Sequence, residues 1–406
     1  MKYKKRAIEE ILRQYLKQFK VVLVTGPRQV GKSTLLKQIL QDKYEYVTLD
    51  DMNELDMAQS DPAQFFRNHR TPLIIDEVQY APNLFRQIKY LADQSDEKGQ
   101  FCLTGSQTYE LMQNVSESLA GRIGILELSG FSLREQNGIE CNIPFLPTEQ
   151  YYEIRKSSLI QENDIWSWIF RGSMPELLDA EINQSFFYNS YIKTYIERDV
   201  RQLINVKDEK LFYQFLIAAA ARTGELFVPN DIANTIGVSL QTVKAWTSVL
   251  EASGLIFILR PYSNNILKRA IKTSKIYFAD TGLVCSLVGW DNPTTLRNGA
   301  MSGNIFETYI ISEIIKSYRN AGHDTNSLYY YRDRDKKEID MLIIKNATIH
   351  PIEIKKSAQP ASSMAKNFPV LKEIPNMTIG EGCIICLAEK LMRINDTLSI
   401  VPISYL

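Results

Sequence analysis

Val-Val-Leu-Val-Thr-Gly-Pro-Arg-Gln-Val-Gly-Lys-Ser-Thr, residues 21–34, is the stretch that decides the fold of this chain. The apolar residues 21–24 predict a buried strand, and the spacing Gly-x4-Gly-Lys-Ser that follows is that of a phosphate-binding loop (P-loop) leading into a helix. The alternative, a chance glycine-rich turn, is disfavoured because a strand before and a helix after are the context that the motif requires. The residues expected to bind a nucleotide are Gly26, Pro27, Arg28, Gln29, Val30, Gly31, Lys32, Ser33 and Thr34.

The residue types of this loop match phosphate chemistry. Gly26 and Gly31 allow the backbone to turn its N–H groups inward around phosphate oxygens. The helix that begins near Lys32 presents unpaired N–H groups and the positive end of its dipole to the same anion. Lys32 is expected to reach the β- and γ-phosphates, and the Ser33 hydroxyl is expected to ligate Mg²⁺.

Composition limits the class of protein. The 406 residues suggest two or three domains, and 45% hydrophobic with 23% charged residues are ordinary for a globular protein. Because 47 basic residues balance 47 acidic ones, no overall basic field announces a nucleic-acid partner, although a local patch remains open. Sparse cysteines, a polar start of the chain and the lack of a long apolar run predict a cytoplasmic protein without a membrane partner. The Cys383-x-x-Cys386 pair lies in a strand-like run and is interpreted as buried strand rather than a metal site.

An acidic pair follows the apolar run that starts at Leu73. Short apolar strands alternating with helices predict an α/β fold with a parallel sheet covered on both faces. Because ligands of such sheets bind beyond the strand carboxyl ends, Asp76 is expected to hold Mg²⁺ with Ser33, and Glu77 to polarise the attacking water. A solvated strand end is the alternative reading of the pair. Together with the P-loop, the pair predicts hydrolysis of ATP or GTP.

Further strands are expected at residues 46–49, 100–107 and 123–128, and helices at 7–19 and 83–93, with another helix starting at Asp61-Pro62. Polar side chains end the strand at 100–107. Of these, Thr104, Ser106 or Gln107 is expected to contact the γ-phosphate or the water that attacks it.

Four segments in this order carry a resemblance: Gly-Pro-Arg-Gln-Val-Gly-Lys-Ser, Leu-Ile-Ile-Asp-Glu-Val-Gln, Leu-Thr-Gly-Ser-Gln and Ser-Leu-Ala-Gly-Arg. They resemble AAA+-superfamily ATPases of bacteria and archaea that carry a C-terminal domain long catalogued as of unknown function. The resemblance implies ATP as the nucleotide and Gln107, with Ser106 as second choice, as a sensor. It also implies that Arg122 is a γ-phosphate sensor or an arginine finger, acting within its own chain or on a neighbour in a homo-oligomer. A surface ion pair is the alternative for Arg122.

The middle of the chain, residues 151–295, is predicted to be a helical linker followed by a winged helix-turn-helix. Helices at 230–236 and after Ser239 and strands at 255–259 and 275–278 would build that unit. DNA is one expected partner, and a packing module between domains is the alternative. The residues that would meet DNA are Gln241, Thr242, Lys244, Lys268, Arg269 and Lys272.

The last block, residues 296–406, resembles the core of PD-(D/E)xK nucleases, a restriction-endonuclease-like α/β fold. Its pattern is a helical Glu307 followed by Asp340, Glu353 and Lys355 on two predicted strands. In that family two or three carboxylates hold Mg²⁺, and the lysine positions or activates water for attack on a phosphodiester. Asp340 follows Ile339 where the family's pattern has proline.

Three units are therefore predicted: an AAA+-like P-loop ATPase (1–150), a helical linker with a winged helix (151–295) and a nuclease-like domain (296–406). The first hypothesis is an enzyme in which Mg²⁺-dependent ATP hydrolysis controls a DNA-acting domain. Its rival is a nucleotide-gated regulatory or scaffold protein whose nuclease-like domain binds a protein partner without cutting.

Overall fold

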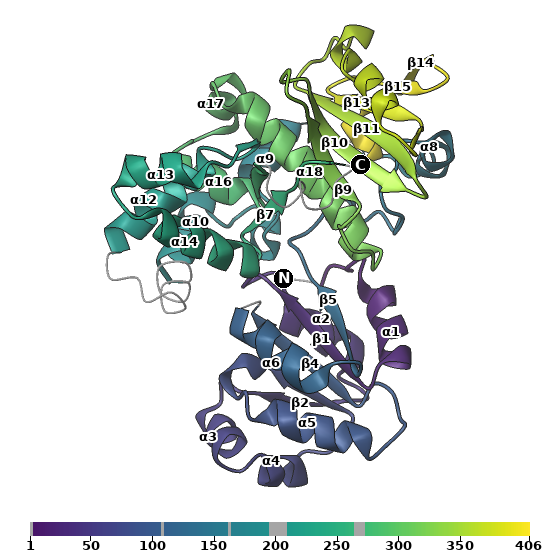
Figure 1. Cartoon of the computed structure of the whole chain (residues 1–406). Coiled ribbons are helices and arrows are strands. Elements are labelled where there is room, and N and C mark those ends of the chain that lie inside the picture. The colour runs from purple at the N-terminus through teal and green to yellow at the C-terminus, as the bar shows by residue number, and fades with distance from the viewer. Residues whose placement is uncertain (1–2, 107–108, 161–163, 195–208, 264–272) are drawn as a thin grey trace.

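The computed structural model describes residues 3–106, 109–160, 164–194, 209–263 and 273–406. The chain folds into a lower lobe that holds the P-loop and an upper part in which a helical unit and a C-terminal sheet lie side by side (Figure 1). None of the described helices is long and apolar enough to cross a bilayer.

The lower lobe is built on a five-stranded parallel sheet in the order β2-β3-β4-β1-β5. The predicted strands are confirmed within one or two residues. The strands are β1 (Val21–Gly26), β2 (Glu45–Thr48), β3 (Leu73–Asp76), β4 (Phe101–Ser106) and β5 (Ile123–Glu127). The helices are α1 (Glu9–Gln18), α2 (Lys32–Leu40), α3 (Met52–Ser60), α4 (Pro62–Asn68), α5 (Leu84–Asp93) and α6 (Tyr109–Leu119).

Both faces of this sheet are covered, as the apolar strands predicted. Side chains alternate along a strand, so Val22 and Val24 of β1 enter one core with Leu12 of α1 and Leu36 of α2. Val21 and Leu23 point the other way and pack in a second core against α5 and α6. Because both sides of β1 are buried, its sequence is apolar without interruption, and the P-loop at its carboxyl end is fixed from two sides.

The middle unit combines helices with a small antiparallel sheet in the order β6-β8-β7. The predicted helix-turn-helix elements are present: α13 (Pro229–Ile236) precedes α14 (Leu240–Ala252), whose cap Ser239 accepts a hydrogen bond from the Thr242 N–H at 3.0 Å. The strands are β6 (Glu225–Leu226), β7 (Ile256–Leu259) and β8 (Lys275–Phe278). The further helices are α9 (Ile165–Arg171), α10 (Gln184–Tyr191), α12 (Glu209–Ala220), α16 (Thr281–Val288) and α17 (Pro293–Asn298). Lys268, Arg269 and Lys272 lie outside the described residues, and the assignment as a winged helix stays a prediction.

The C-terminal unit packs α18 (Ser302–Asn320) against a seven-stranded mixed sheet in the order β14-β15-β13-β11-β10-β9, with β12 paired to β11. The predicted strand pair is present as the antiparallel β10 (Glu338–Lys345) and β11 (Thr348–Lys355). The other strands are β9 (Leu328–Arg332), β12 (Thr378–Ile379), β13 (Gly382–Cys386), β14 (Met392–Asn395) and β15 (Leu398–Pro402). Cys383 and Cys386 are buried in β13, as their strand-like setting predicted.

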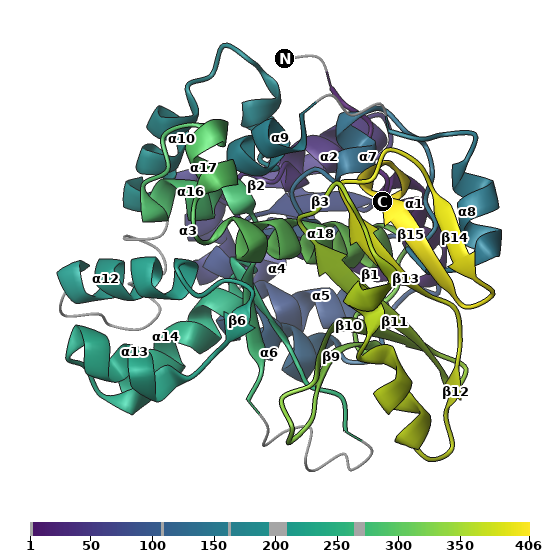
Figure 2. The same cartoon turned by 90° about the horizontal axis from the view of Figure 1, so that it is seen from above.

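The units share one continuous apolar core that runs from the α1–α2 face of the lower sheet to α18 and the C-terminal sheet. In Figure 2, α18 lies between the helices of the middle unit and the C-terminal strands. The short helices α7 (Leu133–Gln136) and α8 (Glu149–Arg155) bind the end of the chain, because Arg134 and Arg155 both donate to the Leu406 carbonyl. The predicted domain limits at 150 and 295 stay a prediction.

Candidate functional site

The two glycines of the P-loop are required by its geometry. Gly26 has φ +147°, and a Cβ at this position would lie 2.1 Å from the Leu128 carbonyl oxygen. Gly31 is left-handed (φ +91°) and caps α2. A side chain at either position would therefore displace the loop backbone whose N–H groups are to surround a phosphate.

Lys32 is held at the mouth of the loop. Its ammonium donates to the carbonyls of Gly26 at 3.0 Å and Pro27 at 2.9 Å. Burial lowers the pKa of Lys32 to about 8, although the nearby carboxylates of Glu77 and Asp76 oppose the shift. The Lys32 ammonium is buried and bound to two carbonyl oxygens instead of water, so little solvation is lost when it pairs with a phosphate.

Ser33 and Asp76 meet as the motif predicted. The Ser33 hydroxyl donates to the Asp76 Oδ1 at 2.9 Å, so that the two oxygen ligands expected for Mg²⁺ lie side by side. Two further hydroxyls hold the same carboxylate: Tyr46 donates to its Oδ2 at 2.6 Å, and Thr104 donates to its Oδ1. Tyr46 was missed in the sequence because nothing in its local pattern marks it.

Glu77 adopts a left-handed conformation (φ +58°) immediately after β3. Its N–H donates to the Thr104 hydroxyl at 3.3 Å, and its carboxylate accepts a hydrogen bond from the Gln79 amide. Thr104, on the neighbouring strand β4, thus contacts both members of the acidic pair.

Ser106 ends β4 directly beside Gly26. Its hydroxyl is buried and has no hydrogen-bond partner within the described part of the chain. A buried unpaired hydroxyl is uncommon in native structures and points to a group that it could meet at this edge of the sheet. Gln107, the first choice for a sensor, lies outside the described residues.

Arg122 lies away from the phosphate loop of its own chain. It precedes β5, which pairs in parallel with β1 from Ile123 beside Val21, so Arg122 lies at the amino edge of the sheet. The P-loop is at the other edge, roughly 20 Å away for a six-residue strand. The Arg122 guanidinium pairs with Asp93 at 2.6 Å. A role toward the phosphate of its own chain does not fit this position, whereas a role toward a neighbouring chain stays a prediction.

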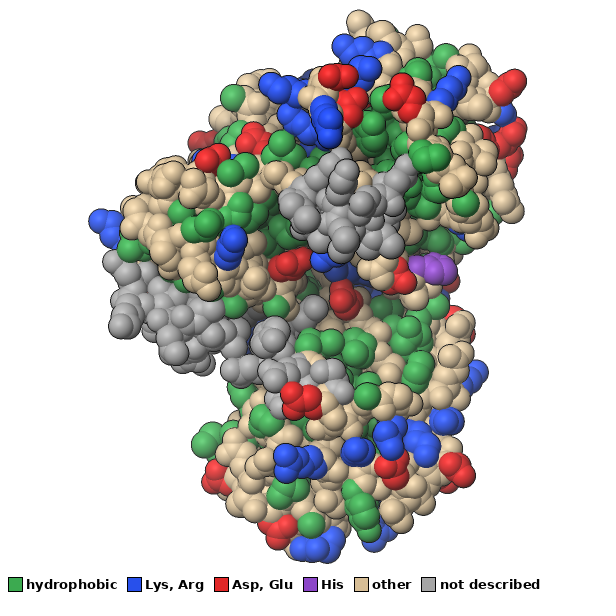
Figure 3. Space-filling model, in the orientation of Figure 1, with side chains coloured by type: hydrophobic (Ala, Val, Ile, Leu, Met, Phe, Trp, Pro, Cys, Tyr) green, Lys and Arg blue, Asp and Glu red, His purple; other side chains and the backbone are tan. Residues whose placement is uncertain are grey.

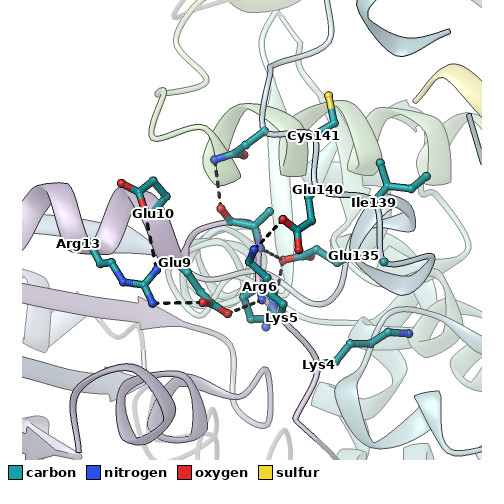
Figure 4. A pocket seen from close by; sticks show the side chains of 13 residues that line it. Lys4, Lys5, Arg6, Glu9, Glu10, Arg13, Glu135, Ile139, Glu140 and Cys141 are labelled. Carbon is teal, nitrogen blue, oxygen red and sulfur yellow. Dashed lines mark hydrogen bonds and ion pairs between the residues drawn. The ribbon is translucent and has the colours of Figure 1, made fainter. Parts of the chain in front are cut away.

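Arg6 is a second residue that the sequence motifs do not mark. Its buried guanidinium donates to the Val30 carbonyl of the P-loop at 2.9 Å and to the Ser129 carbonyl at 2.7 Å. It also pairs with Glu135 at 2.9 Å, and Figure 4 shows the two side chains facing each other at a pocket between α1 and the polypeptide around Cys141. Arg6 therefore ties the start of the chain to the loop on one side and to α7 on the other.

A mainly apolar cavity of about 430 Å³ adjoins the P-loop. It is lined from three directions: Tyr3 at the start of the chain, Gly31 and Thr34 of the loop, and the segment 175–182 of the middle unit, which includes Glu176. The segment is held by Arg171, which donates to the Leu177 carbonyl at 2.5 Å, and by the hydrogen bond from the Phe131 N–H to the Ser173 carbonyl at 2.8 Å. The middle unit thus reaches the P-loop through residues 175–182.

The four nuclease-like residues gather at one place in the C-terminal unit. Lys355 donates to Asp340 at 3.2 Å and to Glu353 at 2.6 Å, and the Ile354 N–H donates to Asp340 at 2.7 Å. Burial, reinforced by the Asp340 carboxylate, raises the pKa of Glu307 and of Glu353 to about 7 each. These shifts indicate that the three carboxylates are close enough to repel one another.

Lys275 and Tyr277 of the middle unit complete this group and were not predicted. The Lys275 ammonium pairs with Glu307 at 3.0 Å and with Glu338 at 2.7 Å, and the Tyr277 hydroxyl donates to Glu307 at 2.6 Å. As they stand, no three Asp, Glu, His or Cys side chains of the described ranges form a group that could hold a metal ion. One observation still favours a cation: the Glu353 Oε2 is buried and has no hydrogen-bond partner there.

The residues expected to meet DNA are partly available. Gln241 and Lys244 of α14 are exposed and Thr242 is half-buried. On the face shown in Figure 3, lysine and arginine side chains are interspersed with aspartate and glutamate. This face therefore offers no broad basic patch among its described residues, and DNA binding stays a prediction.

Comparisons with known proteins match three stretches of the chain. Residues 18–137 match an AAA domain, residues 162–294 a domain of unknown function (DUF8612) and residues 302–406 a domain of unknown function (DUF4143). The AAA match and the P-loop geometry support a P-loop ATPase that binds and hydrolyses ATP. The nature of the C-terminal domain is not given by its match.

Relatives and solved structures are distant. An uncharacterized protein of Mycobacterium tuberculosis is 27% identical over 395 residues, which cover 96% of this chain and 82% of the relative. An uncharacterized protein of Methanocaldococcus jannaschii is 23% identical over 346 residues, which cover 76% of this chain and 72% of the relative. A Walker-type ATPase of Pyrococcus abyssi has a TM-score of 0.42 at 16% identity, covering 69% of this chain and 94% of that one. AMPPCP-bound DnaA of Aquifex aeolicus has a TM-score of 0.29 at 14% identity, and the match covers 60% of this chain and 85% of DnaA.

Proposed function

We propose that this protein is a Mg²⁺-dependent ATPase whose nucleotide state controls its C-terminal domain. The observation that carries the ATPase is the Ser33–Asp76 hydrogen bond beside the buried Lys32. Lys32 would exchange its two carbonyl partners for phosphate oxygens, while Ser33 and Asp76 would hold Mg²⁺ and Glu77 would orient the attacking water. The ion would neutralise charge that develops on the phosphates.

The cavity next to Gly31 and Thr34 would receive the nucleoside. Its apolar walls suit a base, and its carboxylates, Glu176 and Asp179, suit ribose hydroxyls or an exocyclic amine. The middle unit would then sense the nucleotide directly, because the segment 175–182 forms one wall.

ATP binding and hydrolysis by four purified chains test this proposal. We expect Lys32→Ala to abolish binding and Asp76→Asn to retain binding but lose Mg²⁺-dependent hydrolysis by at least about 10²-fold. Lys43→Ala, an exposed lysine just beyond the same helix, is the matched control and should behave like the wild type. Hydrolysis by Asp76→Asn at the wild-type rate would exclude the metal role.

Control of the C-terminal domain is supported by α18. At one end, Glu307 belongs to the carboxylate group. Six residues on, roughly 9 Å along the helix, the Glu313 carboxylate accepts a hydrogen bond from the Leu133 N–H at 2.6 Å, in the segment that also gives Leu128 to the P-loop. One helix thus contacts the carboxylate group directly and the P-loop indirectly, through the segment 128–133.

For the C-terminal domain we propose a metal-dependent action on nucleic-acid phosphodiesters, with Asp340 and Glu353 as carboxylate ligands and Glu307 beside them, paired with Lys275. The unpartnered Glu353 oxygen favours this function. A bound Mg²⁺ or Mn²⁺ would polarise the phosphodiester, and Lys355 would orient water. The alternative is a nucleotide-gated scaffold in which the same domain binds a protein partner.

Cleavage of plasmid and single-stranded DNA with Mg²⁺ or Mn²⁺, with and without ATP, separates the two. We expect cleavage to be lost in Asp340→Asn and retained in Asp396→Asn, an exposed aspartate on the β14–β15 turn. Its loss in Lys32→Ala would establish nucleotide control. An inactive wild type with intact ATP hydrolysis would favour the scaffold.

A further inference from the structure

The carboxylate group of the C-terminal unit contains a cation from a different part of the chain. Lys275 begins β8 of the middle unit, yet its side chain is only 4% exposed and lies between Glu307 of α18 and Glu338 of β10. Its ammonium pairs with both carboxylates, at 3.0 Å and 2.7 Å, so this cation is held between two elements of the C-terminal unit.

The position of Lys275 is fixed by the join between the two sheets. Tyr330 of β9 exchanges backbone hydrogen bonds with the end of the middle sheet: the Tyr262 N–H donates to its carbonyl at 2.7 Å, and its own N–H donates to the Arg260 carbonyl at 3.1 Å. The Tyr330 hydroxyl also donates to the Thr273 carbonyl, two residues before Lys275. These hydrogen bonds hold the backbone near Lys275 against the C-terminal sheet, so the lysine has a fixed position in the carboxylate group.

This group holds more carboxylates than cations. Within the described residues, four carboxylates (Glu307, Glu338, Asp340 and Glu353) are joined to three cations (Lys275, Lys355 and Arg332). Among the described residues, the Glu353 Oε2 has no hydrogen-bond partner, and the Glu353 side chain is 8% exposed. The unpartnered oxygen among the described residues thus lies on the Glu353 side of the group, whereas Glu307 and Glu338 already pair with Lys275.

We infer that the Lys275 ammonium takes the place that a second divalent ion would occupy in a two-metal site. The domain then binds one divalent ion, at Asp340 and Glu353. This inference rests on the proposed metal site. The middle unit then contributes directly to the charge of the C-terminal site, and any movement of β8 against β10 would change how strongly a divalent ion is held there.

Titration of Mn²⁺ into the full chain tests the inference. The chain carries Asp76→Asn and is studied at pH 8 without nucleotide, so that an ion at the P-loop is not counted. We expect the parent to bind one Mn²⁺ and Lys275→Gln to bind a second one or to bind the first at least about tenfold more tightly. Lys275→Arg keeps the charge and should titrate like the parent.

Two controls test whether the Lys275→Gln chain is folded. Thermal unfolding with and without Mn²⁺ should give a larger metal-induced shift for Lys275→Gln than for the parent. If that variant does not fold, Lys275→Gln with Glu338→Gln removes the lysine together with one partner and should show the same gain. Titrations that are identical in the parent and in every folded Lys275-removing variant would overturn the inference and leave Lys275 as an ion pair between the units.

The same titration separates this inference from the metal site on which it rests. A parent that binds no Mn²⁺, beside a Lys275→Gln chain that does, would support the role of Lys275 and reject the proposed site of the native protein. A parent whose single Mn²⁺ is lost in Asp340→Asn, with no change on removing Lys275, would support the site and overturn the role of Lys275.

Discussion

Glu313 and Lys316 form a buried ion pair of 2.8 Å on α18, and both side chains reach back to the polypeptide after β5. Glu313 accepts from the Leu133 N–H at 2.6 Å, and Lys316 donates to the Phe131 carbonyl at 3.2 Å. The side chains are 3% and 5% exposed. The C-terminal unit therefore holds the segment after β5, whose Leu128 lies next to Gly26, by charge-assisted hydrogen bonds as well as by packing.

Glu313→Gln should be strongly destabilising. Removing one partner leaves the Lys316 ammonium buried without a counter-charge, which typically costs about 3–5 kcal/mol. Urea unfolding of the two chains measures the difference. Glu153–Lys156 is a matched control, because it has the same i,i+3 spacing but side chains that are 64% and 66% exposed. Glu153→Gln should change the free energy of unfolding by less than about 1 kcal/mol, and equal effects at the two sites would contradict the argument.

ATP affinity should fall as pH rises through 8. In the free protein the pKa of Lys32 is about 8, so the ammonium is charged at pH 7 and must take up a proton on binding at pH 9. Because phosphate favours the charged form, we expect roughly tenfold weaker binding at pH 9 than at pH 7. Calorimetric titration in two buffers of different ionisation enthalpy measures both the affinity and the proton uptake.

Lys32→Arg is the control for this pH dependence. A guanidinium stays charged throughout this range, so the variant should bind more weakly or equally but with an affinity that does not change between pH 7 and 9. A wild type with the same affinity at both pH values would show that Lys32 is not the group that titrates.

Much of the lower lobe is predictable from sequence because its signals are local. The P-loop spacing, the apolar strands and the cap at Asp61 each lie within a few residues, and the structure confirms them, as it does the cap at Ser239 in the middle unit. The Ser33–Asp76 contact is also predictable, since parallel strands bring their carboxyl ends to one edge. The position of Arg122 had a signal too: a residue before a parallel strand lies at the opposite edge from one that follows it.

Other site residues come from elements that meet only in the folded chain. Arg6 reaches the P-loop from before α1, Tyr46 reaches Asp76 from β2, and Lys275 reaches Glu307 across two units. Their neighbours in sequence carry no motif, because the contact depends on how helices and sheets pack rather than on spacing. Only the three-dimensional arrangement identifies them.

Arg122→Ala tests whether this residue acts on a neighbouring chain. Because Arg122 lies far from its own P-loop, a catalytic role would have to be toward the P-loop of a neighbouring chain. For that role we expect Arg122→Ala to lose ATP hydrolysis by about 10³-fold while retaining ATP binding. Mixing it with Lys32→Ala, which has an intact Arg122, should restore activity. Arg67→Ala, another exposed arginine, is the control. Wild-type hydrolysis by Arg122→Ala at high protein concentration would leave Arg122 as a surface partner of Asp93.

Ser106→Ala should separate activity from stability. The Ser106 hydroxyl is buried beside Gly26 without a partner in the described residues, so removing it should leave the free energy of unfolding unchanged or raise it slightly. If the hydroxyl contacts the γ-phosphate or the attacking water, kcat should fall about 10- to 100-fold with ATP affinity nearly unchanged. Ser33→Ala is the contrasting variant, because it should weaken Mg²⁺-ATP binding itself. Unchanged kcat in Ser106→Ala would remove Ser106 from the site and leave the sensor role to Gln107.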